Sequence, residues 1–136
     1  MKGFFISVLC LVLSVFLFSG CGIEQYDDTR VADLDFTLLA QEDIPQQVMN
    51  VINESKTENF RKTYTDKDYL YIIIGYGAQP TTNYSIAIED LYEAPNAIFV
   101  SSMLKGPSKH EEVVEKETYP YVVLKLNYSD KTVIFK

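Results

Sequence analysis

The chain has 136 residues and a formal net charge of −7, from 12 basic and 19 acidic residues. A chain of this length builds one hydrophobic core, and its acidic balance argues against nucleic acid or anionic lipid headgroups as partners. Ten tyrosines, eight phenylalanines and no tryptophan favour an antiparallel sheet in which tyrosine covers a half-buried face.

Residues 1–20 are predicted to be a secretory signal peptide. Lys2 precedes an uncharged apolar run over residues 4–18, and small residues then lead into Cys21. This order is typical of a bacterial lipoprotein leader, although Phe18 stands where the cleavage motif usually has leucine. Cys21 would then be the acylated first residue of the mature chain, with fatty acids such as palmitate as a stable membrane anchor. The alternative is an uncleaved transmembrane helix, for which the run is short.

Both interpretations place the domain on the extracytoplasmic face of the cell membrane, because Lys2 is the only charge on the leading side. Removing Lys2 with the leader takes one positive charge from −7 and leaves −8. Cys10 lies in the leader and Cys21 carries the lipid, so the mature chain would have no disulfide, no cysteine nucleophile and no cysteine metal site.

Residues 21–33 are predicted to be the lipidated cysteine and a flexible tether, and residues 34–136 a single domain. The domain is expected to begin with a half-buried strand over residues 34–39. Leu34, Phe36 and Leu38 alternate there with a second set of side chains, and alternation of this kind is the signature of a strand with one buried face.

One helix is predicted, over residues 41–56. Asp43 is the expected N-cap, and Pro45 would fall in the first turn, where its missing N–H costs nothing. Apolar residues recur at helical spacing and define the buried face: Ile44, Val48, Val51 and Ile52. The polar stretch that follows, residues 55–67, is predicted to be a loop with room for a short extended piece.

The strongest strand is predicted at residues 69–74, where both faces are apolar and a central position in the sheet is indicated. Residues 84–91 alternate until the phase slips at Asp90, which indicates a β-bulge. Residues 93–96 form the expected turn of a hairpin. Beyond it we expect a strand at 97–105, a charged loop at 108–118, and strands at 121–126 and 132–135.

This order of elements predicts the α+β class. The expected architecture is an antiparallel sheet of five to six strands, partly barrel- or sandwich-like, with one covering helix. A closed all-β sandwich or partial barrel with a helical lid is the alternative.

The sequence contains no constellation typical of an enzyme, and no catalytic residue, cofactor, metal or small-molecule ligand is predicted. His110, the single histidine, falls in the charged loop without an ordered partner for a triad or a metal site. The many acidic residues offer no specific carboxylate pair. Gly75 and Gly77 are not part of a phosphate-binding loop, because no lysine-bearing motif or helix follows them.

The remaining candidate is the loop over residues 75–84, GYGAQPTTNY. Pro80 fixes its own φ angle, and Asn83 tolerates a positive φ. Two interpretations stand open: a turn that only orders two strands, and a presented loop that contacts another protein. The candidate partner-binding residues are Gly77, Gln79, Pro80, Thr81, Thr82, Asn83 and Tyr84.

Around this loop the chain resembles the PrcB-type C-terminal domain of bacterial lipoproteins, a family named from a subunit of a spirochaete surface protease complex. The similar stretches are residues 71–75 (YIIIG), 80–86 (PTTNYSI), 106–107 (GP) and 119–123 (YPYVV). Asn83 replaces the glycine of the family. The resemblance implies a non-enzymatic domain in the cell envelope that assembles or stabilises an exported protease complex by binding other proteins.

A second resemblance is to chagasin-like inhibitors of cysteine proteases, which present a loop similar to residues 79–84 (QPTTNY). Their other two loops are absent here, and Tyr119, Pro120 and Tyr121 form only a distant equivalent of one of them. This resemblance implies, as the alternative function, a protease inhibitor, with residues 119–121 as a second candidate loop.

Overall fold

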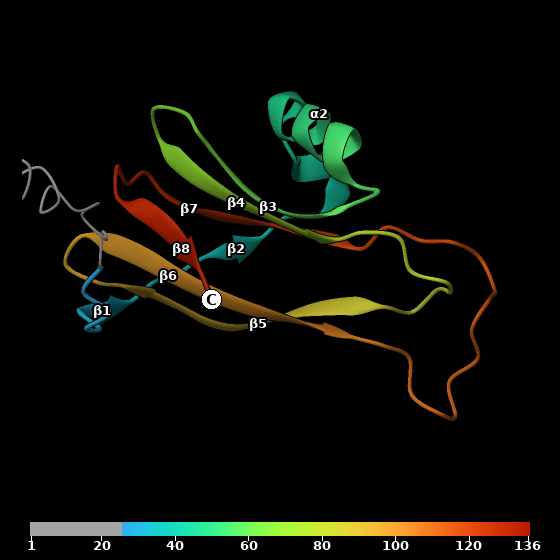
Figure 1. The fold of residues 1–136 in the computed structure, drawn as a ribbon. Coiled ribbons are helices and arrows are strands. Elements are labelled where there is room, and N and C mark those ends of the chain that lie inside the picture. Colours follow the sequence, from blue (N-terminus) through green and yellow to red (C-terminus); the bar gives the residue numbers. More distant parts are fainter. Residues whose placement is uncertain (1–25) are drawn as a thin grey trace, which may run out of the picture.

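The computed structural model describes residues 26–136, so the predicted signal peptide and Cys21 lie outside the described residues. The described chain forms two four-stranded sheets that face each other, with a helix over the outer side of one (Figure 1). The first sheet has the order β1 (Ala32–Asp33), β5 (Ser85–Glu93), β6 (Ala97–Lys105), β8 (Thr132–Phe135). The second has the order β2 (Thr37–Leu38), β7 (Tyr121–Asn127), β4 (Tyr69–Tyr76), β3 (Asn59–Thr65).

The α+β class is confirmed, with mostly antiparallel sheets and one α-helix among residues 26–136. The predicted number of strands was too low, since the structure has eight strands in two sheets rather than five to six in one, and the sheets do not close into a barrel. One pairing, between β6 and β8, is parallel. β6 and β8 run parallel because the chain crosses to the second sheet to form β7 and then returns to the first sheet as β8.

Strand β3 was predicted to be part of a loop. It pairs with β4 over its whole length, from Asn59 opposite Tyr76 to Thr65 opposite Leu70. Only Phe60 of β3 is buried, because β3 lies at the edge of its sheet and most of its side chains stay in water. Its polar composition therefore resembles that of a loop.

The predicted strand at residues 34–39 is also wrong in its extent. Only β2, residues 37–38, falls within it, and the two-residue strand β1 precedes it and belongs to the other sheet. Phe36 and Leu38, expected inside, are 37% and 53% exposed. Leu34 packs on the core between the sheets, whereas Leu39 packs on the core under the helix. The segment crosses from one sheet to the other, so it has no single buried face.

The helix α2 (Gln46–Ser55) begins later than predicted. Pro45 is its N-cap residue and supplies no side-chain hydrogen bond, and Asp43 ends a separate 3-10 turn, η2 (Gln41–Asp43). The expected capping role of Asp43 is therefore wrong. The predicted apolar face is confirmed, since Val48 and Ile52 are fully buried. The face packs on the second sheet through Phe60, Tyr71, Ile73 and Val123.

Three buried clusters hold the described residues together. One lies between the sheets and one between the second sheet and α2, and β4 contributes to both. The third is formed by residues of β5, β6 and the turn between them, with Tyr92 and Phe99 as its large side chains. The predicted central position of β4 is confirmed, because it lies between β7 and β3. The predicted bulge is also confirmed by a register shift between Ile88 and Asp90. Among residues 26–136, no helix has the length and apolar character needed to cross a bilayer.

Gly75 is required by the packing of β4 against β3. A Cβ atom at Gly75 would lie 2.1 Å from Cε1 of Phe60, the residue paired with it. The ring of Phe60 is buried under α2, so it has little room to move aside. Gly75 therefore leaves space for the ring of Phe60, and this packing explains the presence of glycine at this position without any bound ligand.

We predict that Gly75→Ala lowers the free energy of unfolding by about 2 kcal/mol, because the added methyl group overpacks the site. Urea unfolding followed by circular dichroism measures this change. Gly106→Ala is the control, because a Cβ there would lie at an ordinary 3.4 Å from Tyr84 and should change stability by less than about 0.5 kcal/mol. Equal effects of the two substitutions would contradict the packing role.

Candidate functional site

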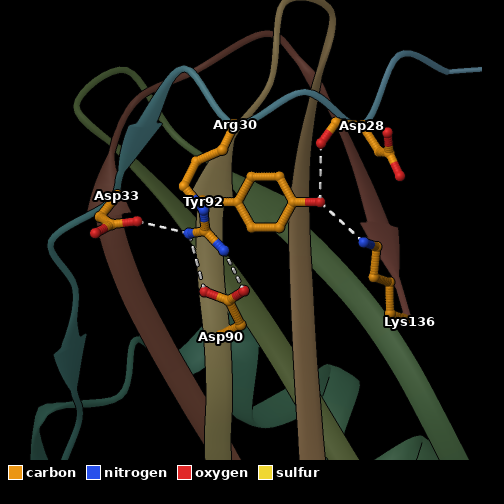
Figure 2. Close-up of polar contacts among 6 residues, drawn as sticks. All are labelled: Asp28, Arg30, Asp33, Asp90, Tyr92 and Lys136. Atoms are coloured by element: carbon orange, nitrogen blue, oxygen red, sulfur yellow. Dashed lines mark hydrogen bonds and ion pairs between the residues drawn. The ribbon is translucent and has the colours of Figure 1, made fainter.

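A set of polar contacts gathers where the described chain begins, around Arg30 (Figure 2). The Arg30 guanidinium makes two hydrogen bonds to Asp90 of β5, at 3.1 and 2.5 Å, and a third to Asp33 at 2.6 Å. These bonds hold the pKa of the Asp90 carboxyl below its ordinary value of 3.8. The arginine thus ties the N-terminal segment to the first sheet.

Tyr92 is the centre of this group. Its ring stacks on Phe99 at 5.2 Å, and the Arg30 guanidinium lies 4.1 Å from the ring centroid. The Lys136 ammonium donates to the Tyr92 hydroxyl at 2.9 Å, which raises the pKa of Lys136. That hydroxyl donates in turn to the carbonyl oxygen of Asp28 (Figure 2). We call Asp28, Arg30, Asp33, Asp90, Tyr92 and Lys136 the N-terminal clasp.

The clasp holds part of the predicted flexible tether, residues 28–33, against the first sheet. Backbone bonds reinforce it, from Val31 N–H to Glu93 O at 2.7 Å and from Leu34 N–H to Leu91 O at 3.2 Å. Arg30 is paired with Asp33 and Asp90, and Lys136 is bonded to the Tyr92 hydroxyl. These contacts attach the N-terminal segment to the first sheet.

The candidate loop meets a second loop, and the two project together from the end of the sheets opposite to β1 (Figure 1). Residues 77–84 and residues 108–118 form what we call the double loop. Gln79 and Thr118 exchange both backbone hydrogen bonds, at 2.8 and 2.9 Å, as in a short antiparallel bridge. The Thr118 hydroxyl also donates to the carbonyl oxygen of Thr81 at 2.7 Å.

The tip of the double loop is fixed by a further set of bonds. Thr82 N–H donates to the carbonyl oxygen of Val114 at 3.1 Å, and Val114 N–H donates to the Thr82 hydroxyl at 3.0 Å. The Asn83 side-chain amide donates to the carbonyl oxygen of Glu112 at 2.9 Å. The expectation that Asn83 adopts a positive φ is confirmed, at 72°. Backbone groups of a charged, exposed segment thereby find partners that shape it.

The predicted partner-binding residues divide by exposure. Pro80 and Asn83 are exposed, whereas Gln79 and Thr81 are half-buried. Gly77 is buried with a φ of 72°, and a Cβ there would lie 3.2 Å from the backbone nitrogen of Asn59. Gly77 therefore sets the course of the chain, and the exposed residues are those that can meet a partner.

The second candidate loop is more closely built into the sheet. Pro120 accepts a hydrogen bond from Tyr76 N–H through its carbonyl oxygen at 3.2 Å, and Tyr121 is the first residue of β7. The Tyr119 hydroxyl donates to Glu117 at 2.9 Å, and the Lys56 ammonium lies 5.5 Å from its ring centroid. Only the outer part of Tyr119 adjoins the double loop.

Sequence reasoning missed that the charged loop braces the candidate loop. A signal was present, because Val113 and Val114 interrupt the charges and lie 38% and 62% exposed. His110 is exposed in the same loop. Among residues 26–136, no group of three or more His, Cys, Asp or Glu side chains is arranged to hold a metal ion.

The fold and this site define a two-sheet domain with a covering helix and a braced, projecting double loop. The family described as PrcB C-terminal matches residues 70–127. This part of the chain is thus similar to the PrcB C-terminal family, and it contains both halves of the double loop. No match was found among curated proteins or among solved structures.

We predict that Asn83→Ala loosens the double loop more than Asn83→Gly does. Both remove the bond to Glu112, but only alanine is forced into a left-handed conformation, at a cost of about 1 kcal/mol. Amide hydrogen exchange at Val114 and Thr118 measures the opening. Equal exchange rates in the two variants would show that the positive φ is not a constraint.

The clasp predicts an acid-dependent attachment of residues 28–34. Because the folded-state pKa of Asp90 is depressed, its stabilising effect is complete above pH 3.8 and is lost as the pH falls through the lower pKa. The amide NMR signals of Val31 and Leu34 should shift in that acid window. In Asp90→Asn the charge is absent at every pH, so the signals of Val31 and Leu34 should show no shift in this acid window. A transition unchanged in Asp90→Asn would contradict the assignment.

Proposed function

We propose that the protein is a non-enzymatic, lipid-anchored domain of the cell envelope that binds another protein through the double loop. The observation that carries the proposal is the exposed apolar tip on a braced backbone. Both backbone groups of Val114 are bonded to Thr82, yet the Val114 side chain is 62% exposed. A loop whose backbone is held in place before binding loses less conformational entropy when a partner covers it.

Exposed apolar side chains stand on both halves of the double loop. Pro80 is exposed on one half, and Val113 and Val114 are neighbours in sequence and exposed on the other. Exposed apolar residues on a loop with a fixed backbone are typical of a contact surface. Charged residues flank the two valines in the sequence of the 108–118 loop and would form the polar rim of an interface.

The membrane anchor belongs to the same proposal. The order of residues before Cys21 supports lipidation there. The double loop lies at the end of the domain opposite to β1, the strand nearest in sequence to Cys21 (Figure 1). A chain anchored at Cys21 would thus present the double loop on the side away from its tether.

The match to a known family suggests which kind of protein the domain binds. The match to the PrcB C-terminal family suggests a domain associated with a protease complex, and we propose an exported protease or one of its subunits as the partner. The domain would assemble or stabilise that complex by contacting it through the double loop.

One observation favours the inhibitor alternative. The bridge between Gln79 and Thr118 brings residues 79–84 next to residues 119–121, so the two segments similar to chagasin-like inhibitors lie at one end of the molecule. An inhibitor would insert this end into the cleft of a cysteine protease. Full activity of a papain-like protease with micromolar domain present would rule it out.

Pull-down from membranes with the lipidated protein tests the proposed contact. Val114→Ser should reduce recovery of a specific partner by about tenfold, as expected for a residue at the centre of an interface. Pro80→Ala should weaken it in the same direction. Val31→Ser is the matched control, because Val31 is 60% exposed but lies in the clasp segment at the other end.

Recovery of the same partner at the same level by wild type, Val114→Ser and Pro80→Ala would contradict the double loop as the contact. An equal loss in Val31→Ser and Val114→Ser would point to a general effect of exposed valines. A protease or protease subunit among the recovered proteins would support the protease complex, and an unrelated envelope protein would argue against it.

A further inference from the structure

A pocket opens where the edge strand β2 meets the outer face of the second sheet. Alternation along β7 continues this face from Val123, which packs under α2, to Lys125 and Asn127. Asn127 is paired with Tyr69, the first residue of β4. The double loop begins after Tyr76, the last residue of β4, so the pocket lies at the opposite end of the sheet. Its volume is about 330 Å³, at the small end of the range for ligand sites.

The apolar part of the pocket contains two aromatic rings. The ring of Tyr69 is half-buried and contacts the ring of Tyr71 in the core under α2, with 6.3 Å between the ring centroids. Phe36 is 37% exposed, on the segment that crosses between the sheets. Leu39 adds a half-buried aliphatic wall. The ring of Phe36 is therefore the aromatic surface that a ligand in the pocket can cover.

The polar side chains of the pocket keep their hydrogen-bonding capacity for a ligand. The Lys125 ammonium lies 3.8 Å from the centroid of the Tyr69 ring, and this cation–π contact holds it in place. Within the described chain, the side chains of Asp35, Lys125 and Asn127 make no hydrogen bond or ion pair, although all three line the pocket. The ammonium only donates hydrogen bonds, the carboxylate only accepts them, and the amide does both.

The two charges of the pocket balance, and this restricts the class of ligand. Asp35 and Lys125 are its charged lining residues, so an anionic ligand would be repelled by Asp35 and a cationic ligand by Lys125. A ligand that satisfies all three polar side chains must offer donors and acceptors together. Each hydroxyl group of a sugar does both. A sugar ring also has a face of C–H groups, which matches the exposed ring of Phe36.

We propose that this pocket binds a neutral pyranose sugar, either free or at the end of a glycan. The C–H face of the ring would stack on Phe36. One hydroxyl group would accept a hydrogen bond from Lys125, and another would donate to Asp35. The Asn127 amide would bond a third position of the ring. The site is separate from the double loop, so it does not depend on the protein contact proposed there.

The test is an NMR titration of the whole exported chain, in a detergent without a sugar headgroup. The probes are the methyl glycosides of glucose, galactose, mannose and N-acetylglucosamine. At least one should cause saturable shifts of the amide signals of Phe36, Thr37 and Leu126. Phe36→Ala should weaken its binding about tenfold, because the stacking surface is lost. Leu38→Ala is the matched control and should bind like wild type, since Leu38 is 53% exposed two residues away but does not line the pocket.

Two further variants test the polar groups of the pocket. Lys125→Met keeps a long side chain but removes the ammonium donors, and Asp35→Asn keeps the shape of the side chain but removes its charge. Each should weaken binding of the glycoside about tenfold, as expected for the loss of a hydrogen bond to a charged group. Thermal unfolding identifies the variants that keep the wild-type fold. Val114→Ser, in the double loop, should leave the affinity for the glycoside unchanged.

Several outcomes would overturn the proposal. The first is the absence of saturable shifts with all of the glycosides. The second is an equal affinity of wild type and Phe36→Ala for the glycoside that binds. Saturable binding of glycine or phenylalanine without binding of any glycoside would also overturn it, and it would indicate a site for free amino acids, whose ammonium and carboxylate groups would face Asp35 and Lys125.

Discussion

Strand β4 is apolar on both faces, and the need to cover both faces is the constraint on which the fold depends. Ile72 and Ile74 face the core between the sheets, while Tyr71 and Ile73 face the core under α2. One strand therefore requires a second sheet in front and a helix behind it. Gly75 lets β3 approach closely enough for Phe60 to complete the second core. The remaining strands extend this arrangement to either side.

The same strand leads directly into the double loop, so the buried core determines where this proposed contact surface lies. Beyond Tyr76 the chain leaves the sheet through Gly77, whose positive φ and close approach to Asn59 fix the exit. The 108–118 loop then satisfies the backbone of residues 79–83 outside both sheets. A projecting loop without such bonds would sample many conformations, and ordering it would oppose partner binding.

The polar contacts divide the molecule into regions with different tasks. The N-terminal clasp holds the segment that precedes β1 against the first sheet (Figure 2). The double loop stands at the far end of the domain (Figure 1). Attachment of the N-terminal segment and the proposed partner contact would thus use separate surfaces, so variants of one surface can be tested without disturbing the other.

The sequence by itself determined the elements whose residues carry a local pattern. It predicted the central strand β4, the hairpin of β5 and β6 with its bulge, the apolar face of α2 and the positive φ of Asn83. Alternation, helical spacing and turn chemistry act over a few residues and can be read directly. Only the tertiary structure decided the division into two sheets, the strand β3 and the bracing of residues 77–84 by residues 108–118. These features depend on which distant segments meet, and a polar edge strand or an exposed loop gains its partners only when the rest of the chain has folded.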